Sequence, residues 1–433
     1  MARTQSFATL CGRMPFIDPL PIIPFTRPVK ATVILPGSKS ITNRSLILGA
    51  LGNNTITLRG ALFSRDTQIM VAALRALGFA VETDETALTI TITGQNGEIP
   101  KREATIHVGN AGNVARFVTA LVCLREDGIY HFDGDEAMRS RPIGSLLDAL
   151  ATQGAQADAR NFPFTFKTAG LPGGMVELDA SESSQMLSAL LLVGSHARTP
   201  FRISLTGAPG SRPFVTMTEK MIGQFEAGPT TYHIEGDASA ATYFLTLPLI
   251  VGGELTLPNY RGSLQGDVKF LEVLEQIGLQ ANTSDDEQRF TGDIRGKYMG
   301  VTQNFREFSD TFLTLAALAP LLDGPTKITG IAHTRKQETD RVAGMARELK
   351  KLGQHVIELE DSLEIHPRPI LSGQVIETYH DHRFAMSFGI LGCHDLHKNG
   401  TSWLAIKDPG CCSKTYPHFF DELEQVRQKS LST

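Results

Sequence analysis

The feature that most constrains this chain is a long repeat, in which a small or polar residue opens an apolar helical stretch. Successive openings lie 72, 71, 56, 71 and 71 residues apart, and they are Ser40, Gly112, Ser183, Ser239, Asp310 and Asp381. A period this long indicates repeated folding units rather than a short solenoid repeat. A helix start exposes unpaired backbone N–H groups and the positive end of the helix dipole, both of which favour anions. If the starts converge in space, they form a site for a strongly anionic small molecule.

A second set of helices is expected between the first, and four of its members end at a glycine, where a left-handed residue stops a helix. These glycines are Gly78, Gly154, Gly278 and Gly353. An alternating run follows, as in AVETDETALTITIT, and predicts a β-hairpin. Each unit is therefore expected to read strand–helix–strand–helix–strand–strand. The first helices are apolar nearly all round, which predicts that they pack inside a shell of sheet.

The short interval of 56 residues has its own explanation. After TEKMIGQFEA the chain passes through GPTTYHIEGDAS, which leaves no room for the hairpin of the other units. Three units in each half predict two similar domains, because 433 residues exceed what one hydrophobic core usually supports. We expect one domain at residues 37–236, with its last unit shortened, and a second at residues 1–36 plus 237–433.

Composition excludes several classes of protein. The net charge of −5 gives no global field that favours nucleic acid or an anionic membrane. No apolar run is long enough to span a bilayer, and the first 20 residues lack the apolar core of a signal peptide. The five cysteines show no metal-type C-x-x-C spacing. Reduced thiols predict a cytoplasmic protein without a metal site.

Cations gather at the helix-entry turns, in LPGSKSITNR, GNAGNVAR, RSRPIG, QETDR, DHR and SKTYP. They are Lys39, Arg44, Arg116, Arg141, Arg341, Arg383 and Lys414. Each alone is as well explained by a solvated turn or a surface salt bridge. Together, in a chain of net negative charge, they indicate an anionic ligand.

Two acids stand among these cations. Asp310 opens an apolar helix, and Glu338 lies three residues before Arg341. A positioned carboxylate can transfer protons, so both are candidate acid–base groups. Asp237 and Ser239, in EGDASAATYF, are interpreted as capping residues with a structural role.

The order of the motifs resembles one known family. The segments LPGSKSITNR, GNAGNVAR, RPIG, SSQ, EGDASAATYF, SDTFLTLAALAP, QETDR, DHRFAM and KTYP are similar to those of the 5-enolpyruvylshikimate-3-phosphate synthases, from about residue 22 to residue 425. The resemblance implies a two-domain inside-out α/β barrel built from six βαβαββ repeats, with the active site in the interdomain cleft. It also implies transfer of the enolpyruvyl group of phosphoenolpyruvate to the 5-hydroxyl of shikimate 3-phosphate through a tetrahedral ketal, in the shikimate pathway. A monomer without metal or organic cofactor is expected.

The resemblance also assigns roles to residues. Shikimate 3-phosphate is expected to contact Lys39, Ser40, Arg44, Ser183, Ser184, Gln185, Ser211, Asp310, His333 and Gln337. Phosphoenolpyruvate is expected to contact Lys39, Asn110, Gly112, Arg141, Gln185, Arg341, His382, Arg383 and Lys414. Asp310 is implied to be the base at the 5-hydroxyl, Glu338 the acid at the methylene carbon, and Lys39 a third catalytic residue.

Some positions depart from the family pattern. Gln337 stands where a lysine is usual, with Lys336 one place early, and His333 stands where asparagine is common. Phe214 replaces a frequent tyrosine. Asn113 and Phe117 replace the usual threonine and proline or leucine after GNAG, beside the expected site of the inhibitor glyphosate. An altered sensitivity to glyphosate is therefore expected.

Two alternatives remain at this point. The related enolpyruvyl transferase that acts on UDP-N-acetylglucosamine typically has a reactive cysteine in the loop that here reads GDEAMRSRPIG, without cysteine. A non-catalytic anion-binding relative would not need Asp310 and Glu338. Phosphate release from phosphoenolpyruvate, with and without shikimate 3-phosphate, separates these possibilities.

Overall fold

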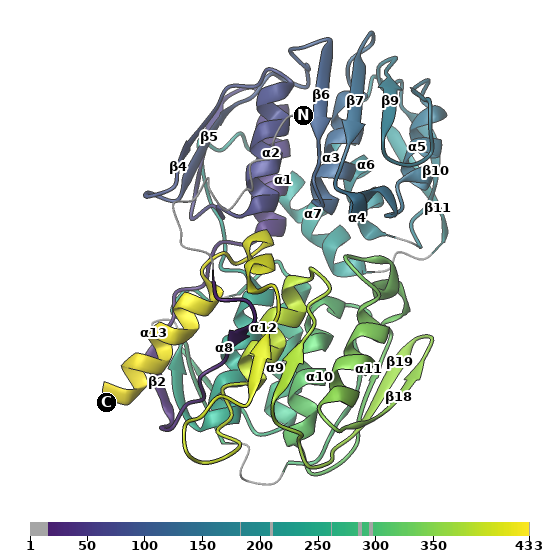
Figure 1. The fold of residues 1–433 in the computed structure, drawn as a ribbon. Coiled ribbons are helices and arrows are strands. Elements are labelled where there is room, and N and C mark those ends of the chain that lie inside the picture. Colours follow the sequence, from purple (N-terminus) through teal and green to yellow (C-terminus); the bar gives the residue numbers. More distant parts are fainter. Residues whose placement is uncertain are drawn as a thin grey trace, which may run out of the picture.

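The protein folds into two lobes, the upper containing most of the first half of the chain and the lower most of the second (Figure 1). A computed structural model describes residues 16–181, 183–207, 211–260, 262–284, 288–293 and 298–432. Buried side chains form one cluster between Ile41 and Ile234, and another that combines residues 22–35 with residues 240–426. Each core lies within one of the two expected domains, residues 37–236 and residues 1–36 with 237–433, and these bounds stay a prediction.

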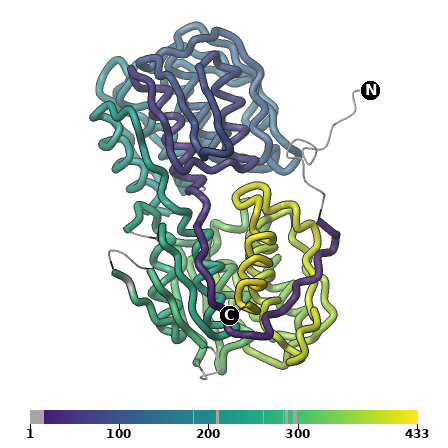
Figure 2. The backbone as a smooth tube through the Cα atoms, turned by 90° about the vertical axis from the view of Figure 1, so that its left-hand side faces the viewer, coloured from purple at the N-terminus to yellow at the C-terminus, as the bar shows by residue number. Residues whose placement is uncertain are grey.

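The chain crosses between the lobes twice, and the two crossings lie side by side. Gly37 and Gly236 form an isolated antiparallel bridge. The backbone N–H of Ser38 donates to the carbonyl oxygen of Glu235 at 2.9 Å. Figure 2 shows the two lobes from the side, and the molecule is narrower where they join. The paired crossings tie the lobes together immediately beside the start of the first helix.

The N-terminal domain contains three repeat units. Its helices are α1 (Lys39–Leu51), α2 (Arg65–Ala76), α3 (Gly112–Val122), α4 (Glu136–Arg139), α5 (Gly144–Ala151), α6 (Ser184–Gly194) and α7 (Arg212–Glu226). Its strands are β3 (Thr55–Arg59), β4 (Val81–Asp84), β5 (Thr89–Thr93), β6 (Glu103–His107), β7 (Ile129–Asp133), β8 (Gln156–Ala157), β9 (Phe164–Lys167), β10 (Gly174–Asp179), β11 (Phe201–Gly207) and β12 (Thr231–His233).

The C-terminal domain repeats this plan. Its α-helices are α8 (Ala238–Val251), α9 (Phe270–Gln276), α10 (Phe312–Leu318), α11 (Arg341–Lys351), α12 (His382–Leu391) and α13 (Phe419–Ser432). Short 3-10 helices are η2 (Gly266–Lys269), η4 (Ser309–Thr311), η5 (Ala319–Leu321), η6 (Ala332–Lys336) and η7 (Pro409–Lys414). Its strands are β1 (Leu20–Pro21), β2 (Val29–Thr32), β13 (Gly253–Thr256), β14 (Gln280–Thr283), β15 (Gln288–Gly292), β16 (Thr302–Asn304), β17 (Thr326–Thr329), β18 (His355–Leu359), β19 (Ser362–His366), β20 (Gln374–Ile376) and β21 (Leu404–Ile406).

Four sheets share one strand order, in which a parallel pair is extended by an antiparallel hairpin. They are β12-β3-β5-β4, β6-β7-β9-β8, β2-β13-β15-β14 and β16-β17-β19-β18. Two further sheets depart from this order: β10 pairs with β11 alone, and β1 lies antiparallel to β21 beside β20. The predicted repeat of strands and helices is therefore confirmed for most of the chain.

The structure confirms that the third unit lacks a hairpin and shows a single short strand in its place. The chain after α7 forms β12, which joins the sheet of the first unit in parallel with β3. In the same way β2, near the N-terminus, supplies the first strand of the fourth unit. The sixth unit also lacks a hairpin after its second helix among the described residues, and β1 takes a place in its sheet. Some units are thus completed by strands distant in sequence, which the repeat pattern did not predict.

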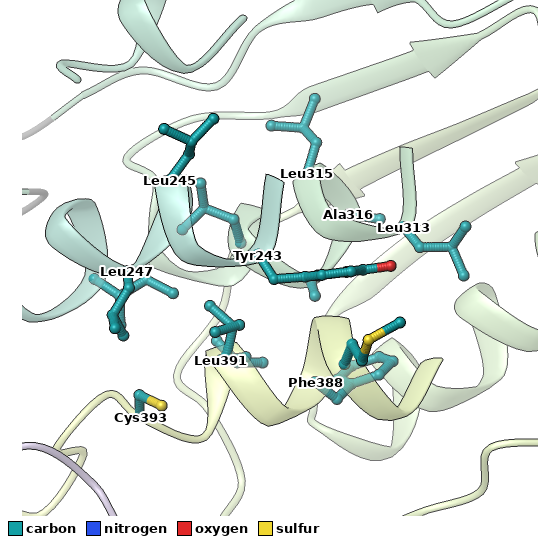
Figure 3. Close-up of a cluster of buried hydrophobic side chains, with 14 of the residues drawn as sticks. Tyr243, Leu245, Leu247, Leu313, Leu315, Ala316, Phe388, Leu391 and Cys393 are labelled. Carbon is teal, nitrogen blue, oxygen red and sulfur yellow. The ribbon is translucent and has the colours of Figure 1, made fainter. Parts of the chain in front are cut away.

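The first helix of each unit lies inside its domain, as predicted. In α1 every residue from Ile41 to Leu51 is buried, and all of α3 is buried. Helices α1, α3 and α6 pack on one another, as do α8, α10 and α12. Figure 3 shows Tyr243, Leu315 and Phe388 of these last three helices within one apolar cluster. The sheets enclose the helices, which gives the expected inside-out α/β architecture.

Local sequence sets where the helices begin and end. Gly78, Gly154, Gly278 and Gly353 have φ values of 96°, 96°, 99° and 85°, so all four stop a helix in the predicted left-handed conformation. Of the polar residues at the helix starts, Ser38 accepts from a backbone N–H of α1. Asp237 caps α8 as expected, whereas Ser239 does not. Ser239 is therefore available for another contact.

Candidate active site

The six central helix starts converge at the junction of the two domains, where they line two adjoining cavities. The main cavity, about 80 Å³ in volume, is lined by Lys39, Ser40, Arg44, Asn113, Arg116, Arg141, Pro142, Ser183, Ser184, Gln185, Ser211, Phe214, Ser309, Asp310, His333, Lys336, Gln337, Glu338, Arg341, His382 and Arg383. The side cavity, about 30 Å³ in volume, begins at Lys39, Asp310 and Arg383 and extends to Ser239 and Asp267 at the start of α8 and in η2. The convergence inferred from the repeat is present in the structure.

The residues that the N-terminal domain contributes to the main cavity form its N-terminal wall, and those of the C-terminal domain form its C-terminal wall. Arg44, on α1, belongs to the N-terminal wall and is only 1% exposed. Its guanidinium donates to Thr218 Oγ1 at 2.7 Å and to Ser188 Oγ at 3.3 Å. The rings of Phe117 and Phe214 lie 5.1 Å and 5.9 Å from it. Within the described chain no carboxylate forms an ion pair with Arg44, and burial lowers its pKa to about 9. A buried cation with only neutral partners is suited to an incoming anion.

Arg141 and the start of α3 form a second part of this wall. Arg141 Nη1 donates to both the carbonyl and the side-chain oxygen of Asn110, each at 3.1 Å. A Cβ atom on Gly112 would lie 2.8 Å from Arg141 Nη2 and from Gln185 Oε1. Glycine is therefore needed for the close approach of α3 to these side chains. Gln185 Oε1 and Arg141 Nε are among the buried polar atoms without a hydrogen-bond partner in the described chain, so both remain available to a polar ligand.

Arg341, at the first position of α11, is the centre of the C-terminal wall. Its guanidinium lies 2.9 Å from Asp310 Oδ1 and 2.8 Å from Glu338 Oε2. It also lies 2.7 Å from Asp381 Oδ2, and Gln337 accepts a hydrogen bond from it. Burial alone would lower the pKa of Arg341, but the three carboxylates outweigh burial and raise it. The residue that caps α12, Asp381, thus also orients the arginine of α11.

Asp310 lies between two arginines. Its Oδ2 atom is 2.6 Å from Arg383 Nη2, in addition to the contact with Arg341. Burial opposes its ionisation, but Arg383 and Arg341 together lower the pKa of Asp310 below its usual value. Asp310 is therefore a carboxylate at neutral pH, and this is the form that can accept a proton.

Glu338 faces cations from both domains. Its Oε1 atom lies 3.8 Å from Arg141 Nη1 of the N-terminal domain and 3.7 Å from Lys414 Nζ of η7. Burial raises the pKa of this carboxyl, but Arg341, Arg141 and Lys414 outweigh burial and hold it well below the usual range. The same cations are the groups expected to hold a phosphate, so a bound anion would compete with Glu338 for them.

Two lysines share an acid that sequence reasoning missed. Lys39 Nζ lies 3.5 Å and Lys414 Nζ 3.3 Å from the two carboxylate oxygens of Asp66, in the first turn of α2. Lys414 Nζ also donates to the carbonyl oxygen of Asn110 at 2.5 Å. Burial lowers the pKa of Lys414. Asp66 carries no signal in the sequence, because an acid in the first turn of an amphipathic helix is commonplace.

Two histidines complete the site in their neutral form. His382 is buried at the start of α12, and burial together with Arg383 and Lys39 holds its pKa well below the ordinary value. His333 Nε2 lies 2.8 Å from Ser309 Oγ, and burial lowers its pKa as well. A neutral imidazole can donate a hydrogen bond to an anionic ligand without adding charge.

The structure brings the predicted site residues together. The main cavity is lined by Lys39, Ser40, Arg44, Arg141, Ser183, Ser184, Gln185, Ser211, Asp310, His333, Gln337, Glu338, Arg341, His382 and Arg383. Asn110, Gly112 and Lys414 lie directly behind these residues through the contacts given above. Phe117, expected beside the phosphoenolpyruvate pocket, lies against Arg44 instead. Besides Asp66, sequence reasoning missed Asp267, which lines the side cavity. Asp381 was expected as a helix start, but its contact with Arg341 was not.

Other kinds of site find no support in the part of the chain that the structure describes. No group of three or more histidine, cysteine, aspartate or glutamate side chains there is arranged to hold a metal ion. No helix among those residues is long and apolar enough to cross a membrane.

The fold and the site define a class of protein in which two α/β repeat domains enclose carboxylates and cations at their junction. Comparison with known proteins gives the family. The chain belongs to the EPSP synthase (3-phosphoshikimate 1-carboxyvinyltransferase) family, whose model matches residues 24–228 and 223–423.

Individual relatives agree with this membership. A 3-phosphoshikimate 1-carboxyvinyltransferase of Opitutus terrae is 50% identical, over 97% of this chain and 100% of the relative. One of Nostoc punctiforme is 37% identical, over 95% of this chain and all of the relative. The solved EPSP synthase of Acinetobacter baumannii has the same fold, with a TM-score of 0.75 at 23% identity over 94% of this chain and 98% of that one.

Proposed function

We propose that this protein transfers the enolpyruvyl group of phosphoenolpyruvate to the 5-hydroxyl of shikimate 3-phosphate, releasing phosphate. Family membership and the similarity to relatives with this name support the reaction. The observation that carries the assignment to this cavity is the ionised Asp310 fixed between Arg341 and Arg383, opposite the unpaired cation Arg44. The substrates bring two phosphates and two carboxylates, whose mutual repulsion requires many cations and helix starts in one place.

Each substrate has a suitable part of the wall. Arg44, with Ser40 and the helix start at Ser183 and Ser184, offers one buried cation and several hydroxyls for shikimate 3-phosphate. Arg141, Lys414 and the start of α3 offer cations and backbone N–H groups for the phosphate of phosphoenolpyruvate. Because Lys414 and Glu338 contact residues of the other domain, the site is complete only when the two domains are together.

The reaction follows from the two acids. Asp310 takes the proton of the 5-hydroxyl while the hydroxyl oxygen bonds to C2 of phosphoenolpyruvate. Glu338 gives a proton to C3. Glu338 becomes able to hold that proton when Arg141 and Lys414 turn to the substrate phosphate, because its pKa then rises. The resulting ketal loses phosphate from C2 as the Glu338 carboxylate takes a proton back from the new methyl group, which restores the double bond. Closure of the domains keeps water from the intermediate.

Phosphate release tests this function. Purified protein is mixed with phosphoenolpyruvate and one of three partners: shikimate 3-phosphate, UDP-N-acetylglucosamine or buffer. Rapid release only with shikimate 3-phosphate is expected. Release with UDP-N-acetylglucosamine would assign the sister reaction, and no release in any mixture would contradict a catalytic role.

Glyphosate inhibition, a monomeric state and a cytoplasmic location are further parts of the proposal. Asn113 lines the main cavity, and its buried Nδ2 atom has no hydrogen-bond partner among the described residues. We expect the neighbouring α3 start to alter glyphosate sensitivity, because a small shift at Gly112 would crowd an inhibitor longer than phosphoenolpyruvate. The double variant Asn113→Thr with Phe117→Leu tests this, and an inhibition curve identical to that of the unmodified protein would contradict it. Size-exclusion chromatography with light scattering tests the monomer.

A further inference from the structure

A buried acid that the reaction above does not use lies beside the proposed base. Asp267, in η2, is 5% exposed, and Ser239 Oγ donates a hydrogen bond to its Oδ2 atom. Asp267 and Asp310 line the same side cavity together with Arg383, which lies at the start of α12, and Arg383 lowers the pKa of both carboxyls. The two carboxyls thus share one cavity and one arginine.

The surroundings give these two carboxyls opposite tendencies. Burial and the nearby Asp310 raise the pKa of Asp267 to about 7, which Arg383 and the hydrogen bond from Ser239 only partly offset. Asp310 has two arginines, and its pKa is lowered. In a pair of neighbouring carboxyls the one with fewer cationic partners is the place where a shared proton rests.

The other titratable groups around Asp267 do not alter this order. Lys39, Asp237, Tyr243, Arg383 and Tyr416 line the side cavity with the two carboxyls, and burial beside Asp267 raises the pKa of the nearby Tyr260. Burial raises the pKa of each of these three tyrosines, so they stay protonated. Asp237 adds negative charge and further favours a protonated Asp267. The acids of the adjoining α9, Glu272 and Glu275, are exposed to solvent.

The proposed base needs such a neighbour. Asp310 is a carboxylate because two arginines stabilise that form, and the same arginines make it poor at keeping a proton. The side cavity is about 30 Å³ in volume, which is room for a water molecule with polar partners on several sides. A proton on Asp310 therefore has a short polar route to Asp267.

We propose that Asp267 receives, through a water molecule in the side cavity, the proton that Asp310 removes from the acceptor hydroxyl. The O–H bond of the acceptor breaks as its oxygen bonds to C2 of phosphoenolpyruvate, and Asp310 holds the proton first. Transfer to Asp267 returns Asp310 to its carboxylate form, and the proton reaches solvent when the products leave. Asp267 does not touch the substrates. It acts through Asp310, which it returns to the carboxylate form, and is therefore a positioning residue. This inference rests on the proposed function.

The test uses Asp267→Asn and Asp267→Glu, with Glu348→Gln as a matched control. Glu348 is an equally buried acid of the same domain, held by Tyr379 and Lys351 away from both cavities. Activity of the unmodified protein is measured first, so that failure of the proposed function is seen separately. Its kcat should rise with pH through about 7, because Asp267 must be ionised to receive the proton.

For Asp267→Asn we expect kcat to fall roughly 10- to 100-fold, which is a smaller loss than removal of a positioned general acid or base causes. The rise near pH 7 should disappear, with both KM values within about twofold of normal. Asp267→Glu should restore part of kcat and the pH dependence, and Glu348→Gln should change neither.

Two outcomes would overturn the inference. One is an Asp267→Asn protein with normal kcat and an unchanged pH profile. The other is an equal loss in Asp267→Asn and Asp267→Glu without a change in the pH profile, which would mean a structural role. If Asp267→Asn fails to fold, the pH profile of Asp267→Glu decides, because a relocated carboxyl must move the rise near pH 7.

Discussion

The two domains repeat the same fold, yet their helix starts differ in charge. The central helices of the N-terminal domain begin at neutral residues: Ser38 caps α1, Ala111 precedes α3 and Ser183 caps α6. In the C-terminal domain Asp237 caps α8 and Asp381 caps α12. Asp310 stands in the 3-10 turn that leads into α10. The helix starts of the N-terminal domain are therefore open to anionic ligands, whereas those of the C-terminal domain already carry aspartate side chains.

The arginines follow the same division. Arg44 in the N-terminal wall has hydroxyl, carbonyl and aromatic partners, whereas Arg341 in the C-terminal wall contacts three carboxylates. A cation without an acid partner favours binding of an anion, and a fixed carboxylate between arginines favours proton transfer. The difference teaches that one repeat can serve two purposes when only the charge of its helix starts changes.

The largest expected effect is on turnover. Asp310→Asn removes the proposed base but keeps the shape of the side chain, so kcat should fall by about 10²–10⁴. Binding of shikimate 3-phosphate should not weaken, because Arg341 and Arg383 each lose an acid partner. Steady-state kinetics with Asp148→Asn as the control measures this, since Asp148 pairs with Arg160 on the surface. Near-normal turnover would remove Asp310 from the mechanism.

The next effect concerns stability. Arg341→Met leaves Asp310, Glu338 and Asp381 without their shared partner, and breaking a buried network of this kind costs about 3–5 kcal/mol. Urea unfolding should show this loss in the free energy of unfolding. A stability equal to that of the unmodified protein would contradict the role given to Arg341 in the C-terminal wall.

Arg44→Met should behave in the opposite way. No acid pairs with Arg44 in the described chain, so its removal should leave the free energy of unfolding unchanged or raise it. Binding of shikimate 3-phosphate should weaken roughly 10- to 100-fold through the loss of a charge-assisted contact. Unfolding curves for the two methionine variants, measured side by side, check the contrast. Equal destabilisation would break the comparison of the two walls.

The smallest expected effect is the loss of thermal stability at low pH. The pKa values of Asp310 and Glu338 are lowered in the folded protein, so their stabilising effect is complete above their ordinary values of 3.8 and 4.5. It is lost as the pH falls through the lower, folded-state values. The Tm of the unmodified protein should therefore drop between pH 5 and pH 3 more steeply than that of Arg341→Met. Parallel curves would contradict this.

The helix starts could be predicted from the sequence because their evidence is local. Ser183 and Asp310 are each recognised as a helix start because a polar residue precedes an apolar stretch, whatever the tertiary structure. The regular spacing indicates that such starts belong to equivalent units. The resemblance then gave ligands to the starts at Ser40, Gly112, Ser183 and Asp310. The left-handed glycines after the second helices were predictable for the same reason, because one turn of chain determines them.

Other features depend on partners distant in the chain. Strands β2 and β12 have only four and three residues. Strand β2 joins the sheet of the fourth unit, which begins much later in the chain, and β12 joins the sheet of the first unit, which begins far before it. No local pattern tells which sheet such a strand joins. Asp66 and Asp267 resemble ordinary acids of a first helical turn, and only the fold brings them beside Lys414 and Asp310. Ser239 was interpreted as a cap, but it instead bonds Asp267.

The central claim is that the N-terminal wall binds shikimate 3-phosphate through Arg44, whereas the C-terminal wall supplies the proposed base Asp310. Calorimetric titration of shikimate 3-phosphate into Arg44→Met and Asp310→Asn tests it most directly. The account predicts binding at least tenfold weaker than normal for Arg44→Met and no weaker than normal for Asp310→Asn. Equal loss in both variants, or loss confined to Asp310→Asn, would contradict it.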